Sequence, residues 1–161
     1  MKSSDARAMD DRDYMRAALR LASEAGRQGE VPVGAVVVVD GRIVGEGFNQ
    51  PIASHDPTAH AEIGAMRAAA VGAANYRLTG ATLYVTIEPC MMCVGAMVHA
   101  RIARLVYGAP EPKAGAIEST DRAHERPALN HRLEVAGGVL ESDCRALMQT
   151  FFAARRENTR E

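Results

Sequence analysis

The stretch A-T-L-Y-V-T-I-E-P-C-M-M-C, residues 81–93, decides the fold of this chain. Its apolar first half predicts a buried strand, Glu88-Pro89 predicts a turn, and the run from Cys90 to about Ala100 predicts a helix. A second apolar segment, A-R-L-V-Y-G at 103–108, predicts another strand. Because a helix separates these two strands, we expect them to pair in parallel within one sheet.

The segment before this stretch predicts a hairpin between two helices. Residues 33–39 and 42–48 flank Asp40-Gly41, a favoured two-residue turn, and the first of these strands is apolar enough to be buried on both faces. Apolar residues at helical spacing predict a helix that begins at Asp10 or Asp11 and ends near the glycines at 26–29. Residues 49–57 predict a loop, and Asp56-Pro57 predicts the start of a helix running from about Thr58 to Ala74.

The segment after residue 108 is harder to interpret. Residues 109–132 are polar and aperiodic, so we expect a loop with a short helix. Apolar residues at helical spacing from Cys144 to Phe152 predict an amphipathic terminal helix that starts near Ser142. The whole pattern predicts an α/β fold, in which helices cover a mixed sheet.

Composition narrows the class of protein. The chain has 161 residues, 47% of them hydrophobic, and a net charge of −1. We expect a single domain over 10–161, preceded by a loose N-terminus at 1–9. The polar N-terminus, the odd number of cysteines and the absence of a long apolar run predict a cytoplasmic protein without a membrane partner.

Two short motifs contain side chains suited to chemistry: H-A-E at 60–62 and P-C-M-M-C at 89–93. His60, Cys90 and Cys93 form a Cys₂His set of zinc ligands, which in catalytic sites leaves a fourth position for water. Glu62 points away from His60 on a helix, so we expect it to move protons beside the metal rather than to bind it. A non-catalytic zinc site and a redox-active C-x-x-C are the alternative interpretations.

H-x-E combined with P-C-x-x-C is the signature of zinc-dependent nucleobase deaminases. Several flanking stretches extend the similarity over nearly the whole chain: E-V-P-V-G-A-V at 30–36, G-F-N-Q-P-I at 47–52, H-D-P-T-A-H-A-E-I at 55–63, N-Y-R-L at 75–78 and G-A-M-V-H-A-R-I at 95–102. With these stretches the chain resembles the bacterial tRNA-specific adenosine deaminases, a family within the cytidine and deoxycytidylate deaminase superfamily.

The resemblance implies a cytidine-deaminase-like three-layer fold, with a mixed five-stranded sheet and helices on both faces. It also implies a homodimer with one zinc ion per subunit, bound by His60, Cys90 and Cys93. The implied reaction is hydrolytic deamination of adenosine to inosine at the wobble position of a tRNA anticodon, with Glu62 as the catalytic proton carrier.

Four further residues are candidate substrate contacts through the resemblance. Asn49 matches a position that contacts the flipped base, although it also suits an ordinary turn. Phe152 matches an aromatic-basic C-terminal element, and its helical spacing equally suits packing. Asn130 and His131 match a segment that faces RNA, and exposed loop residues are the plainer interpretation.

The segment from 109 to 127 departs from the family pattern. It contains Pro110 and Pro112, has Glu111 where aspartate is usual, and adds the acidic residues Glu118 and Glu125. These acids argue against a continuous basic groove for RNA. A deaminase of a free base or nucleoside, such as guanine or cytosine, is therefore the first alternative function, and a non-catalytic zinc-binding or RNA-binding module is the second.

Overall fold

A computed structural model describes residues 8–159 of the chain. The predicted loose N-terminus at 1–9 lies mostly outside these residues. The helices are α1 (Asp11–Arg27), α2 (Pro51–Ser54), α3 (Ala61–Ala73), α4 (Met91–Ala100), the 3₁₀ helix η1 (Ala123–Glu125) and α5 (Glu141–Asn158). The strands are β1 (Gly34–Val39), β2 (Arg42–Phe48), β3 (Thr82–Ile87), β4 (Arg104–Ala109) and β5 (Glu134–Ala136).

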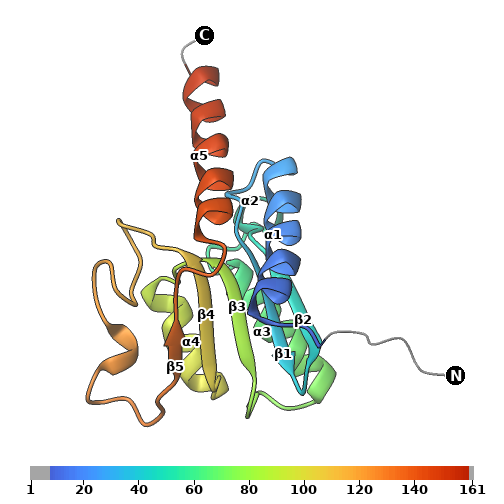
Figure 1. Cartoon of the computed structure of the whole chain (residues 1–161), viewed down its shortest axis with the longest axis vertical. Coiled ribbons are helices and arrows are strands. Elements are labelled where there is room, and N and C mark those ends of the chain that lie inside the picture. The colour runs from blue at the N-terminus through green and yellow to red at the C-terminus, as the bar shows by residue number, and fades with distance from the viewer. Residues whose placement is uncertain (1–7, 160–161) are drawn as a thin grey trace, which may run out of the picture.

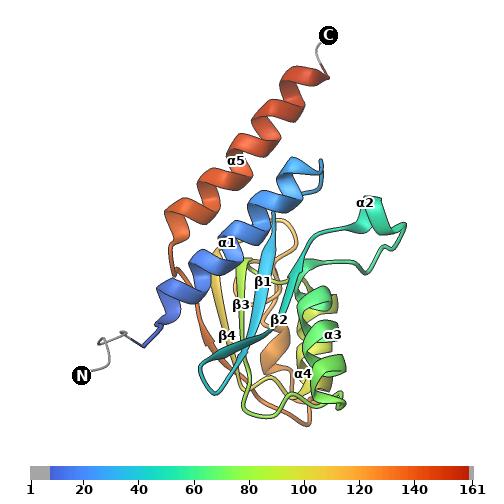
Figure 2. The same ribbon diagram turned by 90° about the vertical axis from the view of Figure 1, so that its right-hand side faces the viewer.

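The five strands form one mixed sheet in the order β2-β1-β3-β4-β5. The first three of these strands pair antiparallel, whereas β3, β4 and β5 are parallel. Helices α1 and α5 lie on one face of the sheet and α3 and α4 lie on the other (Figures 1 and 2). The predicted three-layer α/β architecture with parallel pairing around the P-C-M-M-C segment is therefore confirmed.

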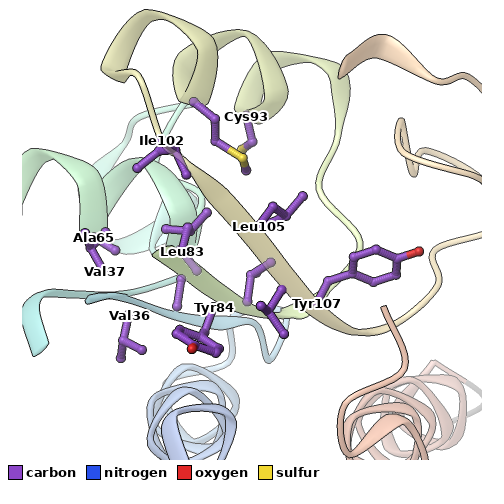
Figure 3. Packing of buried hydrophobic residues seen from close by; sticks show 14 of the residues in the cluster. Val36, Val37, Ala65, Leu83, Tyr84, Cys93, Ile102, Leu105 and Tyr107 are labelled. Carbon is purple, nitrogen blue, oxygen red and sulfur yellow. The ribbon is translucent and has the colours of Figure 1, made fainter. Parts of the chain in front are cut away.

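Alternating side chains of the central strands fill both sides of the sheet. Val36 and Tyr84 point toward α1, while Val37 and Leu83 point toward α3 and α4 (Figure 3). All four are buried, in agreement with the prediction that the first strand is covered on both faces. The hairpin turn is confirmed by positive φ angles of 49° at Asp40 and 74° at Gly41, which a type I′ turn requires.

The structure corrects the expected start of α3. The side chain of Asp56 does not cap that helix, because it accepts hydrogen bonds from the backbone N–H and the hydroxyl of Thr58. The helix begins at Ala61, three residues later than predicted, and His60 is its N-cap. Residues 51–54, predicted as loop, form α2, while the short helix expected between 109 and 132 is η1.

No described helix is both long enough and apolar enough to cross a membrane.

Candidate metal centre and substrate pocket

The N-termini of helices α3 and α4 meet near the carboxyl end of the central strand β3. His60 is the N-cap of α3 and Cys90 is the N-cap of α4, and both have extended backbone conformations. Neither side chain makes the hydrogen bond that usually caps a helix, so both are available as ligands. Cys93 lies one turn into α4 and is buried.

The ligand atoms of these three residues lie close together. Nδ1 of His60 is 3.6 Å from Sγ of Cys90 and 3.5 Å from Sγ of Cys93. Zinc bonds of ordinary length at tetrahedral angles place a nitrogen and a sulfur ligand roughly 3.5 Å apart. The set therefore fits a zinc ion, and among residues 8–159 it is the one His, Cys, Asp or Glu group with such spacing.

The two thiols differ in their proton affinity. The hydrogen bond from Cys93 lowers the pKa of Cys90 to about 4 against the effect of burial, and His60 contributes in the same direction. The pKa of Cys93 is raised, first by its contact with Cys90 and then by burial. Cys90 also raises the pKa of His60, so the three side chains are coupled to one another, and a divalent cation bound by them would displace their protons.

Glu62 lies beside this set without belonging to it. It occupies the first turn of α3, is only 4% exposed, and burial raises the pKa of its carboxyl group. Together with His60 and Cys90 it lines a pocket of about 290 Å³. The carboxylate thus faces the space where a reacting group would lie next to the metal ligands.

Asn49 also lines this pocket. Its side-chain oxygen accepts a hydrogen bond of 2.8 Å from the backbone N–H of Ala61, and so it caps α3 in place of His60. Within residues 8–159 its amide nitrogen has no hydrogen-bond partner. Asn49 therefore presents a hydrogen-bond donor in a fixed orientation to whatever enters the pocket.

Phe152 lies at the mouth of the pocket, on α5, and is 39% exposed. A second cavity of about 500 Å³ adjoins it and shares Phe152, Glu111 and Lys113 with the first. Arg145 and Arg156 complete the cationic part of its lining. The two cavities together form a groove that is larger than a single base requires.

Asn130 and His131 lie elsewhere. They precede β5, and they contact residues just before β4, at the amino end of that strand rather than at its carboxyl end. The ring of His131 is 2.7 Å from the carbonyl oxygen of Ile102, and Asn130 accepts a hydrogen bond from Arg101. The structure thus brings His60, Glu62, Cys90, Cys93, Asn49 and Phe152 together, and it places Asn130 and His131 apart from them.

Two buried carboxylates near the site were not predicted. Glu30 accepts hydrogen bonds from the backbone N–H groups of Ile52 and Ala53, which fixes helix α2 after Asn49. Glu88 accepts hydrogen bonds from the segment after β4. The only signal in the sequence was the presence of acids inside apolar stretches, which does not identify their partners.

Comparison with known proteins identifies similar chains. A family model described as the cytidine and deoxycytidylate deaminase zinc-binding region matches residues 8–109. A tRNA-specific adenosine deaminase of Haemophilus influenzae is 51% identical over 158 residues, which are 98% of this chain and 91% of that protein. One of Agrobacterium fabrum is 45% identical over 143 residues, covering 89% and 94%.

Solved structures with the same fold include both tRNA-editing and base-deaminating proteins. One, from a study of A-to-I editing by tRNA deaminases at the wobble position, has a TM-score of 0.82 and 46% identity, covering 83% of this chain and 97% of that one. A guanine deaminase from Nitrosomonas europaea has a TM-score of 0.77 at 22% identity, covering 91% and 87%. The second likeness shows the fold alone.

Proposed function

This chain belongs to the family of tRNA-specific adenosine deaminases, and we propose on that basis that it converts adenosine to inosine at the wobble position of a tRNA anticodon. The reaction adds water to the purine, releases ammonia and needs no other co-reactant. The observation that carries this proposal is the pocket in which Glu62 lies beside the His60, Cys90 and Cys93 set.

The metal ligands, Glu62 and Asn49 each have a role in this reaction. His60, Cys90 and Cys93 would hold a zinc ion, which would supply the Lewis acidity that activates water near neutral pH. Glu62 takes the proton from the water and returns protons to the ring nitrogen and to the leaving amino group. The free amide N–H of Asn49 donates to an acceptor on the edge of the base and so orients it.

The adjoining cavity supports an RNA substrate over a free base. A flipped wobble base remains attached to neighbouring nucleotides, which need an aromatic surface and cations next to the pocket. Phe152, Lys113, Arg145 and Arg156 provide both. We retain Asn130 and His131 as proposed RNA contacts, to be tested by alanine variants, although their partners in this subunit also give them a structural role.

The test is nucleoside analysis of an anticodon stem-loop with a wobble adenosine, after incubation with the zinc-loaded protein or its Glu62→Ala variant. Inosine from the unmodified protein alone is the expected result. Equal inosine from both proteins would contradict the role of Glu62. No inosine from zinc-loaded protein would favour a deaminase of guanine or cytosine, or a module that binds zinc without catalysis, and assays with free bases would separate these two.

A homodimer is the proposed assembly. The apolar side chains of Met91 and Met92, at the start of α4, are 65% and 37% exposed next to a groove that includes Ala116. A second copy of the chain would remove this surface from water. We expect Met91→Glu to shift the protein toward monomer in sedimentation, whereas Val71→Glu, a change of an exposed apolar residue on α3, should leave its mass unchanged.

The proposed domain spans residues 10–161 and the proposed compartment is the cytoplasm, where tRNA is available and thiol ligands stay reduced. Fractionation of cells that express the tagged chain would test the second point.

A further inference from the structure

Glu88 is a buried carboxylate that neither the metal set nor the proton transfers use. It follows β3 and precedes Pro89 and the ligand Cys90, yet it is not part of the group that could bind a metal. Its side chain points instead into the segment 110–119, and the residue is only 4% exposed. A buried carboxylate requires hydrogen-bond donors, and here the segment supplies all of them.

The hydrogen bonds reach both oxygens of the carboxylate. Oε2 accepts from the backbone N–H groups of Ile117, Glu118 and Ser119 at 3.0, 2.8 and 3.0 Å. Oε1 accepts from the backbone N–H of Glu111 at 2.9 Å and from the hydroxyl of Ser119. The segment has no helix or strand in which its backbone N–H groups could pair. Four of these groups instead donate hydrogen bonds to the single side chain of Glu88.

Close packing supports the same conclusion. A Cβ atom at Gly115 would lie 2.2 to 2.5 Å from the carboxylate atoms of Glu88, which is too short for any contact. The chain therefore passes directly over the carboxylate at the one residue in this turn that has no side chain.

The segment is also a wall of the substrate pocket. Glu111, Lys113 and Ala114 line that pocket together with Asn49 and the metal ligands. Glu88 fixes the backbone N–H of Glu111 itself and those of 117–119, and Lys113 and Ala114 lie between these two points. Their distance from the metal side of the pocket therefore depends on Glu88.

We propose that Glu88 is a positioning residue, whose carboxylate holds segment 111–119 against the pocket and so sets the fit of the purine and the place of Lys113. This inference rests on the proposed function for the identity of the substrate. It gives the acidic, proline-containing segment a defined role, because its backbone N–H groups hold it on Glu88.

The first test is Glu88→Gln in the full-length, zinc-loaded protein. Glutamine has nearly the same shape but would direct an NH₂ group at backbone donors, leaving them unpaired. We expect faster hydrogen exchange at the amides of 117–119. We also expect KM for the stem-loop to rise roughly tenfold, with kcat changed less than about twofold and zinc content unchanged, because the wall contributes binding rather than chemistry.

Gly115→Ala tests the same contact from the other side, since it displaces the segment while Glu88 remains. It should give the same rise in KM and the same loss of protection at 117–119. Ser119→Ala removes only the hydrogen bond from the Ser119 hydroxyl to Glu88, so it should raise KM less. This variant can replace Glu88→Gln in the test if Glu88→Gln does not fold.

Two variants serve as matched controls. Gly72→Ala is the same substitution at a glycine with no atom within 4 Å of the added carbon, and it should leave KM unchanged. Asp11→Asn removes a different hydrogen-bonded carboxylate, far from the segment, so it should lower stability without changing KM.

Wild-type KM and wild-type exchange in both Glu88→Gln and Gly115→Ala would overturn the proposal. A rise in KM for Asp11→Asn as large as that for Glu88→Gln would also overturn it, because the effect would then be general destabilisation. If the unmodified protein makes no inosine, the proposed function fails, and the exchange of the 117–119 amides alone decides whether Glu88 holds the segment.

Discussion

At the scale of single residues, the site depends on side chains that lack their usual local partners. His60 and Cys90 are helix N-caps without a capping hydrogen bond, and the oxygen of Asn49 caps α3 instead. The N-terminal ends of both helices therefore lie next to the ligand thiols, where their partial positive charge favours thiolates.

Asn49→Asp separates the two functions of this side chain. The remaining oxygen can still accept from Ala61, but the amide donor to the base is lost. Loss of one hydrogen bond in a buried site costs about 1–3 kcal/mol, so we expect kcat/KM for the stem-loop to fall roughly tenfold to a hundredfold while thermal stability changes little.

Asn49→Ala is the companion variant for this prediction. It removes both the donor and the cap of α3, so its thermal midpoint should fall by several degrees, corresponding to about 1 kcal/mol, in addition to the loss of activity. Unchanged kinetics for Asn49→Asp would show that the amide nitrogen does not contact the substrate.

Site residues could be predicted from the sequence where their chemistry is local. His60, Glu62, Cys90 and Cys93 stand in two short motifs, and the structure brings those motifs together. Glu30 and Glu88 could not be predicted, because each is defined by backbone donors 22 to 31 residues away, in the short helix α2 and in the segment after β4, and no periodic pattern encodes such contacts.

At the scale of elements, α3 is placed by glycines of β2. A Cβ atom at Gly47 would lie 2.3 Å from the carbonyl oxygen of Ala61 and 2.5 Å from the backbone nitrogen of Ala65. The helix therefore lies directly on the strand, and this contact fixes the turn that contains His60 and Glu62.

Gly47→Ala should push α3 away from the sheet. Overpacking against backbone atoms costs about 1–3 kcal/mol or more, so we expect a lower free energy of unfolding in urea. Because the displaced turn contains a zinc ligand, zinc content after dialysis against a mild chelator should fall too. Gly72→Ala, at an open position of α3, should lower neither quantity.

Helix α1 is attached to the sheet by a carboxylate. Arg104 on β4 donates to both oxygens of Asp11 at 2.9 and 2.8 Å, and the hydroxyl of Tyr84 donates at 2.7 Å. The hydrogen bond from Arg104 is the main reason that the pKa of Asp11 lies below its usual value of 3.8, against a smaller effect of burial.

A lowered pKa means that the ionised form stabilises the folded state. This contribution is present above pH 3.8, the value expected in the unfolded chain, and is lost as the pH falls through the folded pKa. We expect Asp11→Asn to be less stable than the unmodified protein by about 1 kcal/mol at pH 7, since the pair is partly exposed. The difference in urea midpoints should shrink below pH 3.8, and a difference independent of pH would contradict this account.

The elements could be predicted where apolar periodicity is strong. The four long strands and the helices α1, α4 and α5 follow from it. The resemblance implied five strands, but apolar periodicity could not locate β5, because it has three residues, of which Glu134 is exposed, and among the described strands it pairs only with β4. The start of α3 was misplaced because Asp56-Pro57 can form either a helix cap or, as here, a local turn.

At the scale of the whole molecule, a protein with a net charge of −1 must bind a polyanion through a local surface. The described groove has three cations, Lys113, Arg145 and Arg156, and Arg145 is paired with Glu141. RNA affinity should therefore depend on few phosphate contacts and fall only moderately with salt.

Salt dependence consequently separates an RNA substrate from a free base. We expect binding of the stem-loop to the Glu62→Ala protein to weaken with a slope of about −1 to −3 in a plot of log affinity against log salt concentration. Lys113→Ala and Arg156→Ala should each make this slope less steep by about 1. Arg42→Ala, at the end of β2 away from the pocket, should leave the slope unchanged. A slope near zero in the unmodified groove would mean that phosphates are not bound there, and it would favour a small uncharged substrate.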